Sequence, residues 1–130
     1  MEPPDPAGLE DRFGRALDVL GVATGDLVLI ELTQRVKDSI RTYDLFGRYG
    51  GEEFILLIDE INEQGIIKNT ERIRRKVCET PMLLNDLKLD ITASFGIAPV
   101  IKNEGLEKAI SLADEALYKA KRNGKNRVEV

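Results

Sequence analysis

The N-terminal segment changes from a proline-rich stretch to a helical pattern of apolar residues. Residues 1–8, MEPPDPAG, hold three prolines and a glycine, a composition typical of an extended or disordered lead-in. From Leu9 to Leu20 the apolar residues follow helical spacing, which predicts a helix. Gly21 can end this helix, because glycine readily adopts the left-handed conformation found just past many helices.

A second helix is expected to follow at once. The sequence TGD, from Thr24 to Asp26, offers a cap or a first-turn carboxylate, both of which are common where helices begin. The helix is predicted to run to about Arg41, and four apolar side chains form one of its faces, namely Leu29, Leu32, Val36 and Ile40. This face predicts that the helix packs against a core.

A hairpin is predicted after the second helix. Leu45–Tyr49 and Glu53–Ile58 have strand-like composition, and the Gly50-Gly51 pair between them favours a tight turn. The second strand continues as FILLI without alternating with polar residues. Both of its faces are therefore expected to be covered.

The rest of the chain adds two helices, a second hairpin and a final strand. Helices are predicted over Ile66–Glu79 and Leu106–Arg122, with Gly124 just past the end of the second. Between them, residues 81–100 indicate two strands joined by a tight Asn-Asp turn, and the final NRVEV suits an edge strand. The pattern predicts one α+β domain over residues 1–130, with helices packed on an antiparallel-rich sheet.

Composition restricts the chemistry more than the fold. The 130 residues are 42% hydrophobic and 32% charged, as in ordinary soluble proteins, and a net charge of −4 argues against nonspecific binding to nucleic acid. Because the chain has no histidine, a metal site would use carboxylates, which favour hard cations such as Mg²⁺. The single cysteine, Cys78, allows no internal disulfide and fits a reducing cytoplasm. No apolar run reaches membrane-spanning length.

The tip of the first hairpin carries the most informative motif, GGEEF. Its two glycines let the main chain turn sharply and approach a ligand closely. Glu52 and Glu53 follow at the start of a buried strand, where two adjacent carboxylates repel each other unless a cation offsets their charge. A metal held there could also bind a triphosphate. The alternative is an ordinary hairpin with solvated acids.

GGEEF, over Gly50–Phe54, matches the signature of the GGDEF family of bacterial diguanylate cyclases in its common Glu variant. Three later stretches resemble the same family in the same order, namely ERIRRKV from Glu71, ITASFGIA from Ile91, and ADEALYKAKRNGKNRV from Ala113 to Val128. The similarity extends from about Thr24 to the end of the chain. It implies a nucleotide-cyclase palm-like fold with a ferredoxin-like core.

The resemblance implies that two GTP molecules, one on each domain of a homodimer, are joined into cyclic di-GMP with release of pyrophosphate. Metal ions, Mg²⁺ or Mn²⁺, would stabilise the charge on the phosphates. By position, Glu52 would ligate the metal and Glu53 would support the metal or its bound water. Gly50 and Gly51 would allow close approach of the nucleotide. Asp26 would hydrogen-bond guanine.

Lys121 and Lys125 resemble the C-terminal cations that the family places on the phosphates. The family more often has arginine where Lys125 stands, and lysine keeps the charge but loses the bidentate geometry. For both lysines the alternative is a solvated helix end, where cations interact favourably with the helix dipole.

A second constellation precedes the hairpin. Arg41 and Asp44 form R-x-x-D, which in the family marks an inhibitory site that binds cyclic di-GMP away from the catalytic centre. Arginine can hold a phosphate or a guanine edge bidentately, and the acid can accept from guanine nitrogens. Arg72 stands where the family often adds an arginine to this site. The alternative is a salt bridge at a helix end, which is worth little on the surface.

The N-terminal part fits the family poorly, and two registers compete. In the first, DPAGLEDRFGRAL resembles the family's leading D-x-L-T-G-L-x-N-R-x-x-F, with Asp11 in the asparagine place. In the second, counting back from Asp26 places Asp11 and Phe13 on D-x-D-x-F-K-x-x-N-D. Leu9 then replaces the metal-binding aspartate, and Leu17 replaces the guanine-binding asparagine. The first is favoured, because a proline-rich lead-in does not suit a buried strand.

Both registers leave Glu52 without an aspartate on a core strand, and the family's central first strand is expected to be missing. Three functions stay open: a diguanylate cyclase, a degenerate domain that binds cyclic di-GMP or GTP without turnover, and a dimerising remnant without a ligand. The expected partners are GTP, cyclic di-GMP and a second copy of the chain. DNA and a membrane are not expected.

Overall fold

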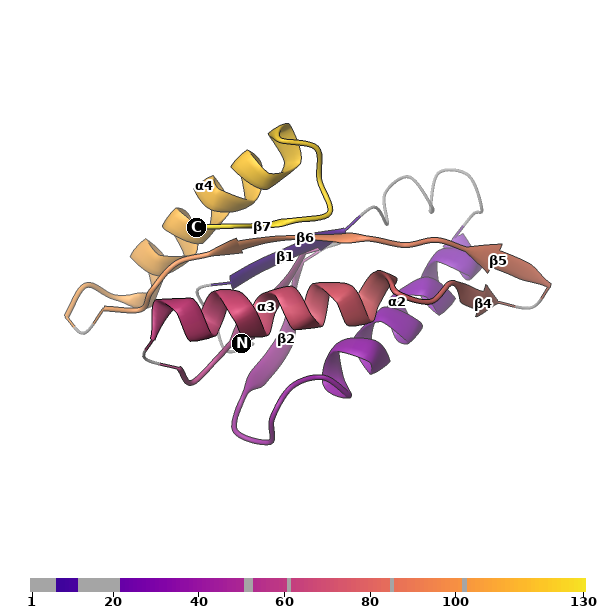
Figure 1. Ribbon diagram of the computed structural model, residues 1–130, viewed down its shortest axis with the longest axis horizontal. Helices are drawn as coiled ribbons and strands as arrows, with labels where there is room; N and C mark the ends of the chain where they lie inside the picture. Colours follow the sequence, from indigo (N-terminus) through magenta and orange to yellow (C-terminus); the bar gives the residue numbers. More distant parts are fainter. Residues whose placement is uncertain (1–6, 12–21, 51–52, 61, 85, 102) are drawn as a thin grey trace.

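A five-stranded sheet, a separate two-stranded ribbon and three helices make up the part of the protein that the computed structural model describes (Figure 1). The main chain is described at residues 7–11, 22–50, 53–60, 62–84, 86–101 and 103–130, and side chains at these positions except 7–11, 22–26 and 50. The helices are α2 (Val22–Lys37), α3 (Glu63–Cys78) and α4 (Leu106–Arg122). The strands are β1 (Ala7–Asp11), β2 (Leu45–Gly50), β3 (Glu53–Leu57), β4 (Met82–Leu84), β5 (Leu87–Leu89), β6 (Ala93–Ile97) and β7 (Val128–Glu129).

The main sheet has the strand order β2-β3-β1-β6-β7. Its neighbours pair antiparallel except β6 and β7, which are parallel. Strands β4 and β5 form the separate antiparallel ribbon. The architecture therefore confirms the predicted α+β class with an antiparallel-rich sheet.

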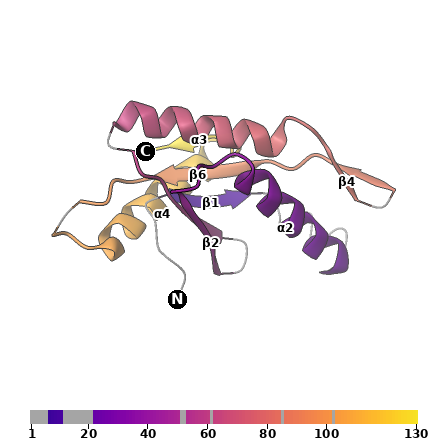
Figure 2. The same cartoon turned by 90° about the horizontal axis from the view of Figure 1, so that it is seen from below.

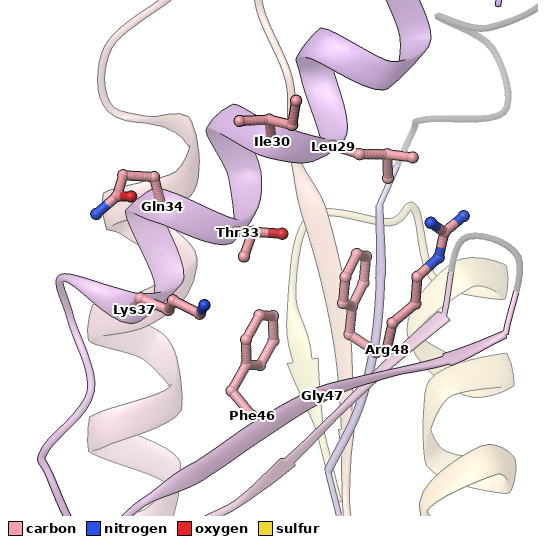
Figure 3. A pocket seen from close by; sticks show the side chains of 9 residues that line it. Leu29, Ile30, Thr33, Gln34, Lys37, Phe46, Gly47 and Arg48 are labelled. Atoms are coloured by element: carbon pink, nitrogen blue, oxygen red, sulfur yellow. The ribbon is translucent and has the colours of Figure 1, made fainter. Parts of the chain in front are cut away.

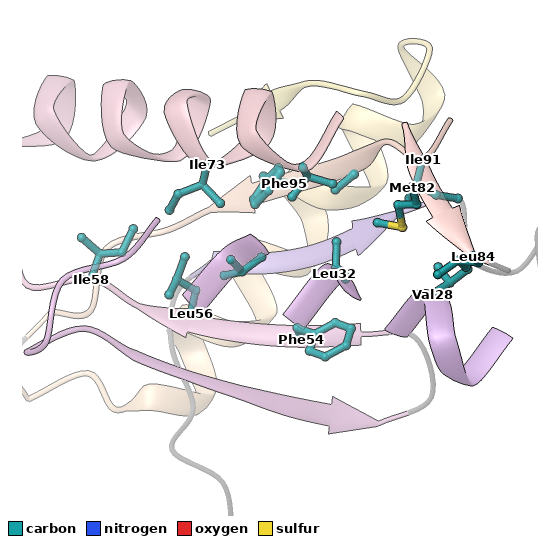
Figure 4. Close-up of a cluster of buried hydrophobic side chains, with 13 residues drawn as sticks. Val28, Leu32, Phe54, Leu56, Ile58, Ile73, Met82, Leu84, Ile91 and Phe95 are labelled. Carbon is teal, nitrogen blue, oxygen red and sulfur yellow. The ribbon is translucent and has the colours of Figure 1, made fainter. Parts of the chain in front are cut away.

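Strand β3 is covered on both faces, as the unbroken FILLI sequence predicts. Phe54 and Leu56 point to one face, where they join a core with side chains from α2 and α3 that include Val28, Leu32 and Ile73 (Figure 4). Ile55 points to the other face, beside Ile110 and Ala113 of α4. Figures 1 and 2 show α3 and α4 on opposite sides of β6. Successive side chains of β3 therefore enter two different layers.

Strand β1 forms the centre of the sheet and was not expected from the sequence. Its main chain pairs with β3 and with β6, so that Leu9 lies opposite Phe54 on one side and Phe95 on the other. The helix predicted from Leu9 is therefore wrong over 9–11, because strand pairing on both edges outweighs a short helical pattern. The lead-in prolines precede this strand in the sequence and none lies within it. The proline-rich lead-in therefore does not argue against a strand at residues 7–11.

The position of Leu9 in a core strand favours the second of the two registers, in which this residue replaces an aspartate. The centre of the sheet is occupied by β1. That the family's own first strand has been lost stays a prediction. Residues 1–6 and 12–21, which include Phe13 and Leu17, lie outside the described residues.

Helix α2 begins at Val22, so Thr24 and Asp26 lie inside it and not at its N-terminus as expected. A residue type that favours a cap is a weak constraint, because other groups can satisfy the first N–H groups of a helix. Among the side chains of this helix that the structure describes, from Leu27 onward, the buried ones are Val28, Leu32 and Val36. Leu29 is only partly buried, and the helix ends at Lys37 rather than near Arg41.

The remaining elements match the prediction with some shifted ends. Helix α3 begins at Glu63, because the side chain of Asn62 accepts hydrogen bonds from the main-chain N–H groups of Gln64 (2.8 Å) and Gly65 (3.2 Å). Helix α4 has its predicted bounds. The second hairpin is confirmed as β4 and β5, but the chain leaves it after Leu89 and enters the main sheet as β6. Among the described residues, no helix is long and apolar enough to cross a membrane.

Helix α4 lies unusually close to the sheet at Gly96 of β6. A Cβ at this glycine would lie 2.2 Å from the Ala113 carbonyl oxygen and 2.3 Å from the Leu117 main-chain nitrogen. These contacts are with the main chain of the helix, which cannot yield as a flexible side chain can. Glycine at position 96 therefore sets the distance between α4 and the sheet.

We expect Gly96→Ala to lower the free energy of unfolding by about 1–3 kcal/mol, because the extra methyl group must push α4 away from β6. Chemical denaturation followed by circular dichroism measures this loss. Gly65→Ala is the matched control, since the added methyl group there meets the flexible Glu60 side chain and alanine favours a helix. Equal stability of the two variants would contradict the close approach of α4.

Candidate functional site

Strands β2 and β3 present the GGEEF tip as the sequence predicts. Their register pairs Arg48 with Phe54 and Gly50 with Glu53, and it shifts between these two pairs. Gly51 and Glu52 lie outside the described residues. The two strands nevertheless fix the positions of Gly50 and Glu53, between which the motif continues.

A groove of about 480 Å³ opens between α2 and the hairpin, and we call it the α2–hairpin groove (Figure 3). Its lining is mostly apolar with a few polar groups, from Leu29, Ile30, Thr33, Gln34, Lys37, Phe46, Gly47, Arg48 and Phe54. Two of these residues, Phe46 and Phe54, stack with their ring centroids 5.3 Å apart. Apolar walls with a few polar groups are typical of small-molecule sites.

Arg48 and Asp26 lie at or near the end of this groove that adjoins the tip. Arg48 is exposed, and it is separated from the GGEEF tip only by Tyr49 in the sequence. Asp26 belongs to the main chain of α2, three residues before Leu29, and its side chain lies outside the described ones. Helix α2 thus carries Asp26 less than one turn from the groove lining.

The opposite face of the hairpin brings Glu53 close to Asp114 of α4. Both residues line a small depression together with Tyr49, Ile55, Ile110 and Ala113. Partial burial raises the pKa of Glu53, and the nearby charge of Asp114 raises it further. Two carboxylates that repel each other in a partly desolvated place favour a proton or a cation between them.

The C-terminal end of α4 holds the two predicted phosphate-binding lysines. Lys121 lies in the last helical turn and is partly buried, and Lys125 follows in the next turn of chain with an exposed side chain. Partial burial lowers the pKa of Lys121, and the charge of Lys125 lowers it further. The two cations therefore lie close to each other, so that they would favour a polyanion.

Arg41 and Asp44, the R-x-x-D pair, lie just before β2. The buried carboxylate of Asp44 accepts hydrogen bonds from the main-chain N–H groups of Arg41 (3.0 Å) and Asp59 (3.3 Å). The Arg41 guanidinium donates to the hydroxyl of Tyr43 (2.7 Å) and lies 5.6 Å from the centroid of that ring. Asp44 therefore fixes the main chain around Arg41, and Tyr43 orients its side chain.

Arg72 is exposed on α3, and its guanidinium donates to Asn69 on the same helix (3.3 Å).

Within the described ranges, no three acidic or sulfur-bearing side chains come together as a metal site. The carboxylates that could approach a cation at the tip are therefore Glu53 and Asp114 among the described side chains.

Arg48 and Asp114 were not expected from the sequence. A signal for Arg48 was available, because Phe46 and Arg48 share one face of a strand and the hairpin pairs Arg48 with Phe54. Asp114 gave no such signal. It is far from Glu53 in the sequence, and only the packing of α4 on the sheet brings the two together.

Comparison with known proteins connects this arrangement to one family. The family described as diguanylate cyclase, GGDEF domain, matches residues 10–127. Diguanylate cyclase DosC of Escherichia coli is 39% identical over 121 residues, which are 92% of this chain and 26% of DosC. The chain thus spans about a quarter of that relative's length.

Solved structures of the same family share the fold. Diguanylate cyclase SiaD of Pseudomonas aeruginosa, in complex with its activator SiaC, superposes with a TM-score of 0.88 at 34% identity, over 94% of this chain and 47% of that one. The GGDEF domain of DgcB from Caulobacter crescentus, in complex with c-di-GMP, gives 0.87 at 30% identity, over 95% and 74% of the two chains. From sequence and fold together, this chain belongs to the GGDEF domain family of diguanylate cyclases.

Proposed function

We propose that this chain binds GTP together with a divalent cation at the GGEEF tip. The observation that carries the proposal is the division of the hairpin into two faces. One face forms the α2–hairpin groove and ends at Arg48, and the other brings Glu53 against Asp114. A nucleotide at the tip would have an apolar surface on one side and paired carboxylates on the other.

Each part of the nucleotide has a candidate partner in this arrangement. The base would lie toward the α2–hairpin groove, where Asp26 would accept hydrogen bonds from guanine. Lys121 and Lys125 would bind the phosphates, which suits two cations held close together. Gly50 and Gly51 would let the main chain approach the nucleotide without a side chain between them.

The carboxylates suit Mg²⁺ or Mn²⁺. Glu52 and Glu53 would hold the cation, whose bound charge would stabilise negative charge on the phosphates. Partial burial and the nearby charge of Asp114 both raise the pKa of Glu53, and a cation held at Glu53 would offset both effects. Asp114 would act on the site through Glu53.

Formation of cyclic di-GMP requires two nucleotides, so that turnover would need two copies of this domain facing each other. Each copy would orient its own GTP so that the 3′-hydroxyl lies against the α-phosphate held by the other. In the second register Leu9 replaces a metal-binding aspartate, and leucine offers no ligand to a cation. We therefore infer that the chain binds GTP but forms cyclic di-GMP slowly or not at all.

A second candidate function is binding of cyclic di-GMP at the R-x-x-D pair. Asp44 and the tip lie at opposite ends of β2, a strand of six residues, so the two sites are about 20 Å apart. The Arg41 guanidinium is oriented by Tyr43, which leaves less freedom to lose on binding. The relative DgcB has been solved with c-di-GMP, which is the ligand expected here.

The first prediction concerns the cation at the tip. Mg²⁺ should strengthen binding of GTP to the wild-type protein, and Glu52→Gln should remove most of this effect, because the amide lacks the charge that attracts the cation. Isothermal titration with α,β-methylene GTP, with and without Mg²⁺, measures the difference. Glu63→Gln, which changes an exposed acid at the start of α3, is the matched control. The same metal dependence in all three proteins would count against the site.

The second prediction concerns the role of position 9. Leu9→Asp should raise the rate of cyclic di-GMP formation at least about tenfold, because it returns a carboxylate to the strand beside β3. Chromatography of a reaction with GTP and Mg²⁺ measures the product. Leu9→Asn is the control, because asparagine has nearly the same shape as aspartate but carries no charge. Rapid turnover by the wild-type protein, unchanged by Leu9→Asp, would contradict both the register and the inferred loss of activity.

The third prediction separates the two sites. Arg41→Ala should weaken binding of cyclic di-GMP by about tenfold or more, since hydrogen bonds to charged groups contribute about 1.5–3 kcal/mol. Its affinity for α,β-methylene GTP should stay within about twofold of wild type, because the tip lies at the other end of β2. Calorimetric titration with each ligand provides the comparison. If both affinities fell together, two separate sites would not explain the data.

A further inference from the structure

We propose that Arg74 and Asn126 form a latch that holds Lys125 in place for the phosphates of the nucleotide. The proposal rests on the proposed function in one respect, which is that Lys121 and Lys125 bind those phosphates. It assigns a positioning role to two residues that do not themselves approach the nucleotide.

The turn that carries Lys125 has a left-handed main chain. Gly124, Lys125 and Asn126 have φ values of 120°, 63° and 49° in succession. Glycine adopts such values freely and asparagine more readily than most residues, whereas lysine meets a steric cost of about 1–2 kcal/mol. Such a conformation persists where surrounding contacts hold it.

Contacts within the helix end account for only part of this turn. The Lys125 N–H donates to the carbonyl of Ala120 (2.9 Å), and the Gly124 N–H donates to the carbonyl of Lys121 (3.3 Å). These bonds close the C-terminus of α4 in the manner of many helix ends. They do not involve Asn126, which is the last left-handed residue.

Helix α3 and strand β6 hold Asn126. The guanidinium of Arg74 donates to the side-chain oxygen of Asn126 at 2.6 Å. The main-chain N–H of Asn126 donates to the hydroxyl of Ser94 at 3.1 Å. The next residue continues the attachment, because the Phe95 N–H donates to the carbonyl of Arg127 (2.9 Å). The turn is thus joined to α3 through the Arg74 side chain and to β6 through the Ser94 hydroxyl and the Phe95 main chain.

Arg74 is itself well fixed. Its side chain is only 16% exposed, and it forms an ion pair with Glu71 one turn earlier on α3. This contact lowers the pKa of Glu71, so that the pair stays charged near neutral pH. Arg74 therefore reaches Asn126 from a constrained position and loses little further freedom in doing so.

The consequence of the latch falls on Lys125, which precedes Asn126 in the same turn. Without the contact from Arg74, the turn would gain freedom and the Lys125 ammonium would spread over a larger volume. Lys121 lies within the last turn of α4 and would be affected less. We therefore expect loss of the latch to weaken contacts with the outer phosphates and to spare contacts with the base.

The test compares affinities for α,β-methylene GTP and for GMP, both with Mg²⁺, by isothermal titration. Asn126→Gly deletes the acceptor but tolerates the left-handed conformation, and Arg74→Gln deletes the guanidinium. Both variants should bind the triphosphate about fivefold to tenfold more weakly and GMP within about twofold of wild type. Asn126→Asp keeps an oxygen for Arg74 and should retain the triphosphate affinity within about twofold.

Arg75→Gln is the matched control for charge. Arg75 is the next residue of α3, its side chain is 70% exposed, and its loss removes the same charge as Arg74→Gln. It should leave both affinities within about twofold of wild type. A fall of equal size in Arg75→Gln and Arg74→Gln would overturn the latch, because it would show an effect of net charge alone. So would equal losses for the triphosphate and for GMP in Asn126→Gly.

Failure of the latch and failure of the proposed function give different results. If Lys125→Ala weakens binding of the triphosphate but Asn126→Gly does not, the latch is overturned and the phosphate site stands. If the wild-type protein binds neither nucleotide, the proposed function is overturned and the latch with it.

Discussion

The burial of β3 between two layers of helices is the constraint on which the rest of the structure depends. Neighbouring side chains of a strand point to opposite faces, so the order Glu-Phe-Ile-Leu sends alternate residues to different layers. Phe54 enters the core under α2 and α3, and Glu53 and Ile55 face α4. A shift of register by one residue would exchange these layers and bury a carboxylate in the core.

The same constraint explains how one hairpin can serve two parts of a ligand. The face of Phe54 is continuous with the α2–hairpin groove, which is mostly apolar and suits a flat base. The face of Glu53 meets Asp114 on α4, and there the two carboxylates repel each other. The close approach of α4 at Gly96 keeps this helix, and with it Asp114, near the sheet. The proposed nucleotide site therefore draws on long-range packing as well as on the motif at its tip.

Local signals in the sequence predicted the first hairpin, the bounds of α4 and the coverage of β3. These features depend on short-range patterns, namely turn glycines, helical periodicity and an unbroken apolar run. Strand β1 was missed because its pairing partners, β3 and β6, are distant in the sequence, and no local pattern of residues 7–11 shows them. The start of α2 was misplaced for a similar reason, since a capping sequence competes with the packing of the whole helix.

In the candidate site, too, some residues could be predicted from the sequence and others could not. The tip and both lysines could be named from motifs, whereas Asp114, the groove and the contact between Arg74 and Asn126 required the fold. The approach of Glu53 to Asp114 and the contact between Arg74 and Asn126 join elements that are separated by several strands or helices along the chain, whereas the groove depends on how α2 packs beside the hairpin that follows it. Packing at such separations leaves no trace in a single sequence, because many residue types satisfy the local pattern equally well.

Paramagnetic relaxation by Mn²⁺ tests the central claim most directly, which is that the GGEEF tip binds a divalent cation together with GTP. In an NMR titration of the protein with Mn²⁺ and α,β-methylene GTP, we expect the amide signals of Glu53 and Asp114 to broaden first. The amide signal of Tyr43, at the far end of β2, should change little at the same metal concentration. Broadening that began at Tyr43, or that left Glu53 and Asp114 unaffected, would contradict the account.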